Sequence, residues 1–144
     1  MYSPAKITAY HRRGLLALLF SFLVGGFAYY GIELLWRGYS HITMWFCGAL
    51  CLSGILLIER AYSRVPLYKR ALLSALFITA VEFVFGCIFN LWLGLGVWDY
   101  SHVPFNLLGQ VCLSYSALWY LLAFPASLVC KLILWAVGLY RVPS

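Results

Sequence analysis

Four long apolar runs, separated by short segments that hold most of the charged residues, set the hydropathy pattern of this chain. They predict helices at residues 14–36, 42–58, 71–92 and 105–128. A hydrocarbon core takes about 20 helical residues, with a range of roughly 17–25, so each run is long enough to cross a membrane. The predicted fold class is therefore all-α: a polytopic membrane four-helix bundle forming a single domain over residues 1–144.

The end of the chain, residues 129–144, forms a tail whose structure the pattern leaves open. Residues 129–140 are apolar, but Lys131 interrupts them. They either extend the fourth helix beyond Pro125 or lie as a short helix in the membrane interface.

Composition supports a membrane protein and argues against a nucleic-acid-binding one. The chain is 65% hydrophobic and only 10% charged, whereas about a quarter of the residues in a soluble domain are charged. Many Trp and Tyr residues lie near the predicted helix ends, as in interfacial belts. The net charge of +6 comes from basic residues that flank the apolar runs, so we expect membrane lipids, and no nucleic acid, as partners.

The distribution of basic residues predicts the orientation, because Lys and Arg concentrate in cytoplasmic loops. Arg37 alone would lie on the outer side, with the loops 37–41 and 93–104. The other nine basic residues fall on the inner side: Lys6, Arg12, Arg13, Arg60, Arg64, Lys69, Arg70, Lys131 and Arg141. We therefore expect a multi-pass plasma-membrane protein with both termini cytoplasmic. The first apolar run is longer than that of a signal peptide, which favours a retained span.

Glu82 is the most informative single residue. It lies in the middle of the third apolar run, about 18 Å along the helix from Arg70. A carboxylate near the bilayer midplane is costly, so it is expected to face the protein interior and to have a partner or a function. A protonated, purely structural Glu82 is the alternative.

Small and polar side chains recur at helical spacing on three predicted helices. They are Ser21, Gly25, Tyr29, Glu33 and Arg37 on the first, Ala75, Thr79, Glu82, Gly86 and Asn90 on the third, and Asn106, Gln110 and Ser114 on the fourth. One interpretation is a hydrated cavity that opens outward, lined by Glu33, Glu82, Asn90, Asn106 and Gln110. The other is ordinary helix–helix packing, which we favour for Ser21, Gly25, Ala75, Thr79 and Gly86.

Charged and imidazole side chains near the outer end leave several roles open. Glu33 and Arg37 have the favourable order for a helical ion pair, although Arg37 is also placed to hold an anionic group or to neutralise Glu82. His41 and His102 either cap helices or join carboxylates as metal ligands, but no tight ligand spacing supports a metal site. The predicted substrate-binding residues are Glu33, Arg37, His41, Glu82, Asn90, Asp99, His102, Asn106 and Gln110.

The longest outer segment, residues 93–104, has its own expected roles. Trp98 and Tyr100 are expected to anchor at the interface and Asp99 to cap a turn or the fourth helix. The apolar character of the segment is compatible with a lid. No cofactor is predicted. The five cysteines form no Cys-x-x-Cys pair and read as small packing residues, and the chain lacks a Walker A, Gly-x-Ser-x-Gly or His-Glu-x-x-His motif.

A short internal repeat relates two parts of the chain at an offset of 61 residues. Residues 39–53 and 100–114 agree at seven of fifteen positions, including Tyr-Ser-His at the start of each. The repeat predicts two helical hairpins related by an axis along the membrane normal, as in some transporters.

Several blocks resemble a family of small four-pass bacterial membrane proteins labelled ABC-transporter type IV, or CmpB-like. The blocks are residues 31–41 (Gly-Ile-Glu-Leu-Leu-Trp-Arg-Gly-Tyr-Ser-His), 58–62 (Ile-Glu-Arg-Ala-Tyr), 81–90 (from Val-Glu-Phe to Asn90) and 98–109 (from Trp-Asp-Tyr-Ser to Gly109). The resemblance implies a four-pass bundle in a bacterial plasma membrane. It singles out Glu33, Arg37, His41, Glu82, Asn90, Trp98, Asp99, Asn106 and Gly109.

Three functions fit the sequence. The first is a transport or solute-binding protein, a permease component in which Glu82 binds a cation, a proton or an amine. The second is an intramembrane enzyme acting on a lipid or isoprenoid, which the lack of a catalytic motif disfavours. The third is an assembly subunit without a site of its own. Four helices make a small permease, so a homodimer, a larger membrane partner or a separate ATPase subunit is expected.

Overall fold

The computed structural model describes residues 4–140 and contains four long helices. These are α1 (Pro4–Arg37), α2 (Ile42–Ala61), α3 (Leu67–Phe85) and α4 (Leu113–Ala136). A π-helix, η1 (Gly86–Trp92), continues α3, and a small antiparallel hairpin of β1 (Asn106–Leu107) and β2 (Val111–Cys112) precedes α4. Four helices are long and apolar enough to cross a membrane, so the prediction of a mainly α-helical protein with four spans is confirmed.

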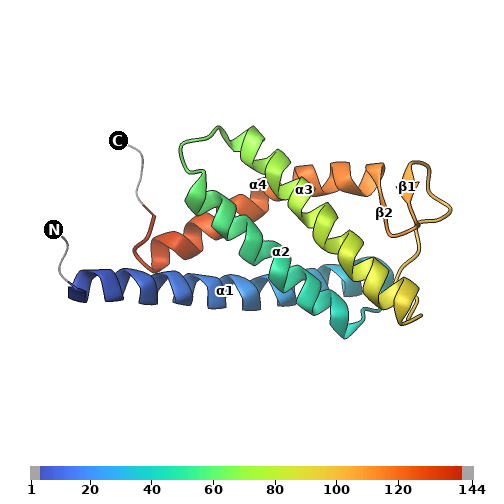
Figure 1. The fold of residues 1–144 in the computed structure, drawn as a ribbon, viewed down its shortest axis with the longest axis horizontal. Coiled ribbons are helices and arrows are strands. Elements are labelled where there is room, and N and C mark those ends of the chain that lie inside the picture. The colour runs from blue at the N-terminus through green and yellow to red at the C-terminus, as the bar shows by residue number, and fades with distance from the viewer. Residues whose placement is uncertain (1–3, 141–144) are drawn as a thin grey trace.

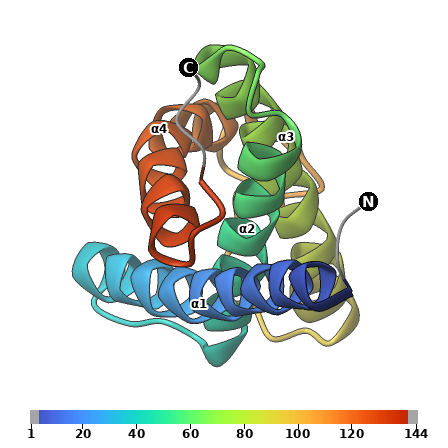
Figure 2. The same ribbon diagram turned by 90° about the vertical axis from the view of Figure 1, so that its left-hand side faces the viewer.

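Successive helices run in opposite directions (Figure 1). The start of α1, the α2–α3 connection and the end of α4 lie at one end of the molecule, which we call the basic end. The end of α1, the start of α2, η1 and the hairpin lie at the other, which we call the hairpin end. Viewed from the side, α1 crosses the face formed by the other helices (Figure 2).

The core is centred on α2, which is the most deeply buried of the four helices. Its apolar side chains pack against residues of α1, α3 and α4, with Cys47, Ile55 and Leu56 almost fully covered. A close backbone approach brings α1 and α2 together, because a Cβ on Gly25 would lie 2.5 Å from the Gly48 oxygen. The packing interpretation of the small residue Gly25 is therefore confirmed.

Polar residues of the predicted stripes also join helices. Ser21 on α1 lies 3.3 Å from Ser53 on α2, and Thr79 on α3 donates to Ser116 on α4 over 3.0 Å. All five cysteines have free thiols. Four of them are buried, in agreement with their interpretation as packing residues.

Three helices extend beyond the apolar runs from which their boundaries were predicted. Helix α1 begins at Pro4 rather than at residue 14, and α3 begins at Leu67 rather than at residue 71. The basic residues before each apolar run are good helix formers, so the helix continues beyond the part that is apolar. Similarly, α2 extends past residue 58 to Ala61.

The predicted start of the fourth helix at residue 105 is wrong. Phe105 and Leu108 have positive φ values of 54° and 53°, and Gly109 has a φ of 68°. This backbone is incompatible with a right-handed helix, and the segment folds as the β1–β2 hairpin. Asn106 and Gln110 consequently do not share a helix face with Ser114. At its other end α4 continues through Pro125 to Ala136, so the extension of the fourth helix is correct and a separate interfacial helix is not.

The internal repeat stays a prediction. Residues 48–53 are helical within α2, whereas residues 109–114 run from the hairpin into the first turn of α4. The two matching segments therefore have different secondary structure.

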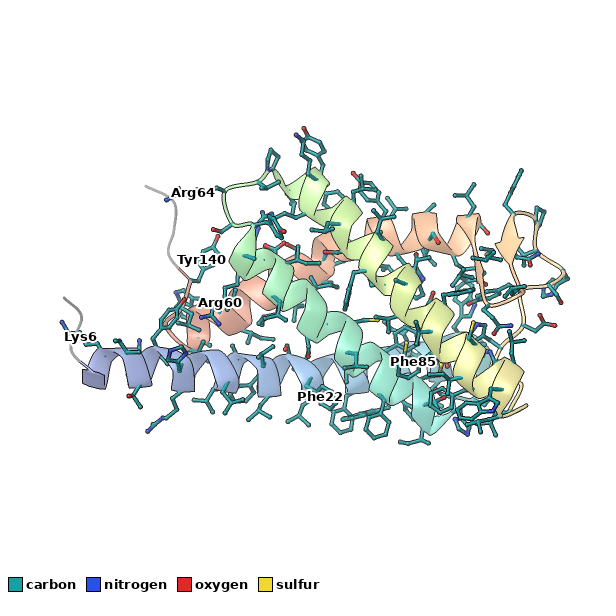
Figure 3. All side chains as sticks on the ribbon, in the orientation of Figure 1. Lys6, Phe22, Arg60, Arg64, Phe85 and Tyr140 are labelled. Carbon is teal, nitrogen blue, oxygen red and sulfur yellow. The ribbon has the colours of Figure 1, made fainter. Side chains whose placement is uncertain are left out.

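Basic side chains lie at the basic end, among them Lys6, Arg60 and Arg64 (Figure 3). This agrees with the one-sided distribution read from the sequence. Arg141, which belongs to the same predicted group, lies outside the described residues. The direction in which the molecule crosses the membrane remains a prediction.

Candidate functional site

Glu82 lies at the meeting point of three helices and is only 3% exposed. The Tyr29 hydroxyl, from α1, donates a hydrogen bond of 3.0 Å to one carboxylate oxygen. The Trp119 indole Nε1, from α4, donates one of 2.7 Å to the other oxygen. The prediction that Glu82 faces the protein interior is thus correct, and each of its oxygens has a neutral donor.

Glu82 has no positively charged partner among residues 4–140. The two ion pairs in this part of the chain join Arg37 to Glu33 and Arg70 to Glu59. A buried carboxylate without a counter-charge costs several kcal/mol more than a paired one. Both oxygens of Glu82 therefore have a hydrogen-bond donor, but no cationic side chain among residues 4–140 balances the charge of the carboxylate.

An apolar cavity of about 260 Å³ shares Tyr29 and Trp119 with this site, although Glu82 itself is not among its lining residues. It is lined by residues of all four long helices, and the rings of Tyr29 and Trp119 form part of its wall. The two ring centroids are 5.8 Å apart. Val24 and Ile32 of α1 also line it and are well exposed, so the cavity reaches the apolar surface of the molecule.

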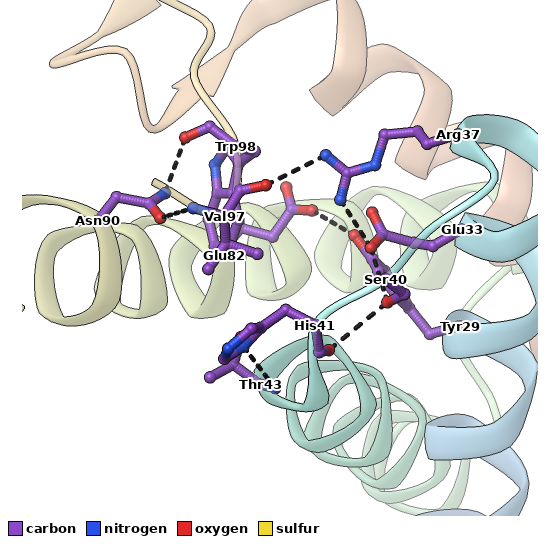
Figure 4. A network of polar contacts seen from close by, with 10 residues as sticks. All are labelled: Tyr29, Glu33, Arg37, Ser40, His41, Thr43, Glu82, Asn90, Val97 and Trp98. Atoms are coloured by element: carbon purple, nitrogen blue, oxygen red, sulfur yellow. Dashed lines mark hydrogen bonds and ion pairs between the residues drawn. The ribbon is translucent and has the colours of Figure 1, made fainter. Parts of the chain in front are cut away.

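Glu33 and Arg37 form the predicted ion pair at the hairpin end, 2.8 Å between Nη2 and Oε2 (Figure 4). Ser40 donates to the same Glu33 oxygen over 3.0 Å. The second nitrogen of Arg37, Nη1, donates to the Val97 carbonyl over 3.2 Å. Arg37 therefore ties the outer loop to α1 and does not neutralise Glu82.

Asn90 clamps the outer loop to η1. Its oxygen accepts a 2.7 Å bond from the Val97 amide, and its nitrogen donates to the Trp98 carbonyl and to the Gln110 side chain. Trp98 in turn donates to the Gln110 carbonyl over 2.8 Å. Trp98 is 7% exposed and packs with Val97 against Met44, so the expectation that it anchors at the interface is wrong. The loop does fold back onto the helices.

The η1 turn explains how Asn90 reaches the loop. Its Leu93 amide bonds to the Ile88 carbonyl, five residues earlier, which is the wider π-helical spacing. Gly86 begins this turn, and a Cβ there would lie 2.6 Å from the Gln110 side-chain oxygen. Gly86 is therefore a packing residue that admits Gln110.

The remaining predicted site residues have local structural contacts. Asp99 accepts 2.8 Å bonds from the amide and the hydroxyl of Ser101, and these bonds lower the pKa of its carboxyl. Asn106 binds the carbonyls of Ser101 and Val103 and the Gly109 amide.

The two histidines of the predicted site, His41 and His102, lie in exposed positions. His41 accepts from the Thr43 amide as the N-cap of α2, which is the capping role considered for it. His102 lies in the turn of the outer loop. Within residues 4–140 no three His, Cys, Asp or Glu side chains come close enough to hold a metal ion.

The predicted substrate-binding residues make mostly local contacts, and a single outward-opening cavity lined by them stays a prediction. Glu82 bonds to Tyr29 and Trp119. Glu33 and Arg37 are joined to Asn90 and Gln110 through the backbone of Val97. Asp99, His102 and Asn106 belong to the outer loop. Trp119 is a new member of the Glu82 site, and only the packing of α4 against α3 shows it.

A second buried carboxylate, at the basic end, was missed by the sequence reasoning. Glu59 and Arg70 are 3% and 8% exposed and form an ion pair of 2.7 Å. Ser127, from α4, donates to the other Glu59 oxygen. In the sequence, both charges border the α2–α3 connection and read as solvated loop charges. Nothing in the sequence around Ser127 indicates that its hydroxyl binds a buried carboxylate.

Comparison with known proteins gives one match. Residues 8–140 match the family described as "Putative ABC-transporter type IV". No curated protein and no solved structure matches the chain. Because the match covers most of the sequence, the chain belongs to this family, as its motifs predicted. With its four apolar helices, it is a multi-pass membrane protein of a transporter-like family.

Proposed function

We propose that this member of the ABC-transporter type IV family is a transport protein of the membrane that binds a solute, as a permease component. Its ligand-binding site is centred on Glu82. The observation that carries the proposal is the buried carboxylate with two neutral donors and no counter-charge among the described residues. Intramembrane carboxylates of this kind mark ion, proton or substrate pathways.

The missing positive charge defines the ligand. A proton or the ammonium group of an amine would supply it, and the two donors would keep the carboxylate oriented during the exchange. Tyr29 and Trp119 add aromatic faces, which attract cations. Tyr29 and Trp119 also line the apolar cavity, so they separate it from Glu82. We infer an organic cation whose apolar body occupies the cavity, enters from the bilayer side and reaches Glu82 when these two side chains move.

Proton and cation would compete for the same carboxylate. Binding of one would exclude the other, so opposite movements of the two would be coupled at Glu82. From the one-sided distribution of basic residues, we propose that the basic end and both termini face the cytoplasm and that the membrane is the plasma membrane.

The transport path needs more than one chain. Four helices form a small permease, so a homodimer or a larger membrane partner would complete the path. The sequence lacks a Walker A motif, and any ATP coupling would therefore come from a separate ATPase subunit.

Exchange of a lipophilic cation for protons tests this function. It is measured with an enclosed pH dye in proteoliposomes whose membrane potential is clamped at zero, beside protein-free liposomes. The probe is tetraphenylphosphonium, and triphenylphosphine oxide is a neutral compound of similar aromatic content. We expect the wild type and Glu33→Gln to release internal protons in exchange for the cation, well above the level of protein-free liposomes, and Glu82→Gln to release no more than protein-free liposomes. The neutral compound should release no protons in any of them. The Glu33→Gln variant is the matched control, because it makes the same chemical change at another glutamate in the hairpin-end half of the molecule. Undiminished exchange by Glu82→Gln would reject the proposal.

The enzyme alternative has weaker support. It needs an acid–base partner beside Glu82, whereas His41 caps α2 and Asp99 binds its own turn. The assembly-subunit alternative makes the opposite prediction in the same experiment, since the wild type itself would not exchange the probe.

A further inference from the structure

A second pocket lies at the basic end of the molecule, far along α1 from the Glu82 site. It has a volume of about 280 Å³ and is lined by Lys6, Ala9, Tyr10 and Arg13 of α1 and by Gly138 and Leu139 after α4. The four α1 residues are spaced three, one and three apart, which places them on one helical face. Arg60 extends this group, because its guanidinium stacks on the Tyr10 ring at 4.8 Å.

The cations of this pocket have no carboxylate side chain as a partner. The chain has only four acidic residues. Glu33 and Glu59 pair with Arg37 and Arg70, and Glu82 and Asp99 bind neutral groups. Within residues 4–140 the charges of Lys6 and Arg13 are therefore uncompensated.

Gly138 shapes the wall opposite these cations. It has a φ of +72°, which lets the chain turn sharply after α4. A Cβ on Gly138 would lie 3.1 Å from Arg13 Nη1, so the guanidinium packs closely over the backbone of this turn. The turn after α4 thereby helps to position the Arg13 side chain at the edge of the pocket.

The length of α1 places the pocket at headgroup level. The helix has 34 residues and measures about 51 Å, whereas a hydrocarbon core is only about 30 Å thick. If the core begins near Gly14, where the apolar run starts, the segment from Lys6 to Arg13 extends about 12 Å beyond it. Leu15 and Leu19, which follow on α1, are more than half exposed and would face acyl chains.

We propose that this pocket binds the phosphate of an anionic phospholipid headgroup. Arg13 would bind the phosphate through its planar fork, Lys6 would add a point charge, and the Tyr10 hydroxyl would donate a further hydrogen bond. The acyl chains would continue along the apolar surface of α1. Anionic lipids are enriched in the cytoplasmic leaflet, the side on which the basic residues place this end. This inference rests on the membrane orientation and not on the function of Glu82.

The test compares two double variants that remove the same charge. Lys6→Gln with Arg13→Gln changes the pocket, whereas Lys69→Gln with Arg12→Gln changes two exposed cations that do not line it. Each variant, purified in a non-ionic detergent, is titrated with phosphatidylglycerol, with phosphatidylcholine of the same chains and with inorganic phosphate. Native mass spectrometry reads the bound lipid, and circular dichroism checks the helical content.

We expect the wild type and the control variant to retain one phosphatidylglycerol in preference to phosphatidylcholine. The pocket variant should bind it at least about tenfold more weakly. Equal affinity in the two double variants, or equal retention of both lipids by the wild type, would overturn the proposal in favour of diffuse surface attraction. Displacement of the lipid by inorganic phosphate would overturn the lipid assignment and would make free phosphate the ligand.

Discussion

Replacing Glu59 by Gln should destabilise the protein strongly, although the two side chains have almost the same shape. The change leaves the amide oxygen that can accept from Ser127 and removes only the charge that pairs with Arg70. The guanidinium would then be buried without its counter-charge. Its Nε already lacks a hydrogen-bond partner among the described residues, so Arg70 has little else to bind.

The size of the effect follows from burial. The side chains of Arg70 and Glu59 are 9% and 2% exposed, whereas those of Arg37 and Glu33 are 23% and 14% exposed. Breaking a buried pair by removing one partner costs about 3–5 kcal/mol. Because the Glu59 pair lies at the ends of its helices, near water, we expect the lower limit, about 3 kcal/mol. The matched variant Glu33→Gln should cost about 1 kcal/mol or less.

Equilibrium unfolding in mixed micelles with increasing dodecyl sulfate measures both values, with far-ultraviolet circular dichroism as the signal. A double variant, Glu59→Gln with Arg70→Met, separates charge from packing, because it removes the unpaired cation as well. It should recover most of the lost stability. The single variant Arg70→Met completes the comparison. The reasoning is refuted if Glu59→Gln stays within about 1 kcal/mol of the wild type, or if the costs of Glu59→Gln and Arg70→Met simply add in the double variant.

Three further predictions concern packing, the outer loop and its turn. Gly48→Ala should lower the free energy of unfolding by about 1–3 kcal/mol, because its Cβ would lie 2.2 Å from an α1 side chain. Gly31→Ala has nothing within 4 Å of its Cβ and should not lower it. Thermal unfolding compares the two, and equal stability of both variants would contradict the close helix contact. Asn90→Ala should speed hydrogen exchange at the Val97 amide, which loses its acceptor, and unchanged exchange would contradict the clamp. The bonds from Ser101 lower the pKa of Asp99, so its ionised form stabilises the turn at pH values above the ordinary pKa of about 3.9. This stabilisation is lost only as the pH falls through the lower pKa of the folded protein. Carbon-13 shifts of its carboxyl should show that titration, and a midpoint at or above the ordinary value would contradict it.

The sequence predicts the four spans well because hydropathy over about 20 residues depends on transfer to the bilayer and little on tertiary contacts. The inward orientation of Glu82 follows from the same physics. The ion pair of Glu33 and Arg37 was also predictable, because both residues lie on one helix at a fixed spacing.

The hairpin before α4 was not predictable from hydropathy. Phe105 and Leu108 adopt positive φ without being glycine, and nothing in an apolar run indicates that. Gln110 donates to the Leu108 carbonyl within this turn, and Asn90, 20 residues earlier, binds the Gln110 side chain.

The partners of the buried carboxylates were also beyond the sequence. Trp119 reaches Glu82 across 37 residues and Ser127 reaches Glu59 across 68. Such pairs depend on how two helices are rotated against each other, and periodicity on one helix does not fix that rotation.

Equilibrium binding of labelled tetraphenylphosphonium to the detergent-purified wild type and to Glu82→Gln, each at several pH values, tests the central claim most directly. The account predicts saturable binding by the wild type that weakens as the pH falls, because protons compete for the carboxylate, and no saturable binding by the variant. Equal, pH-independent binding by both proteins would contradict it, since the cation would then occupy a site that does not use Glu82.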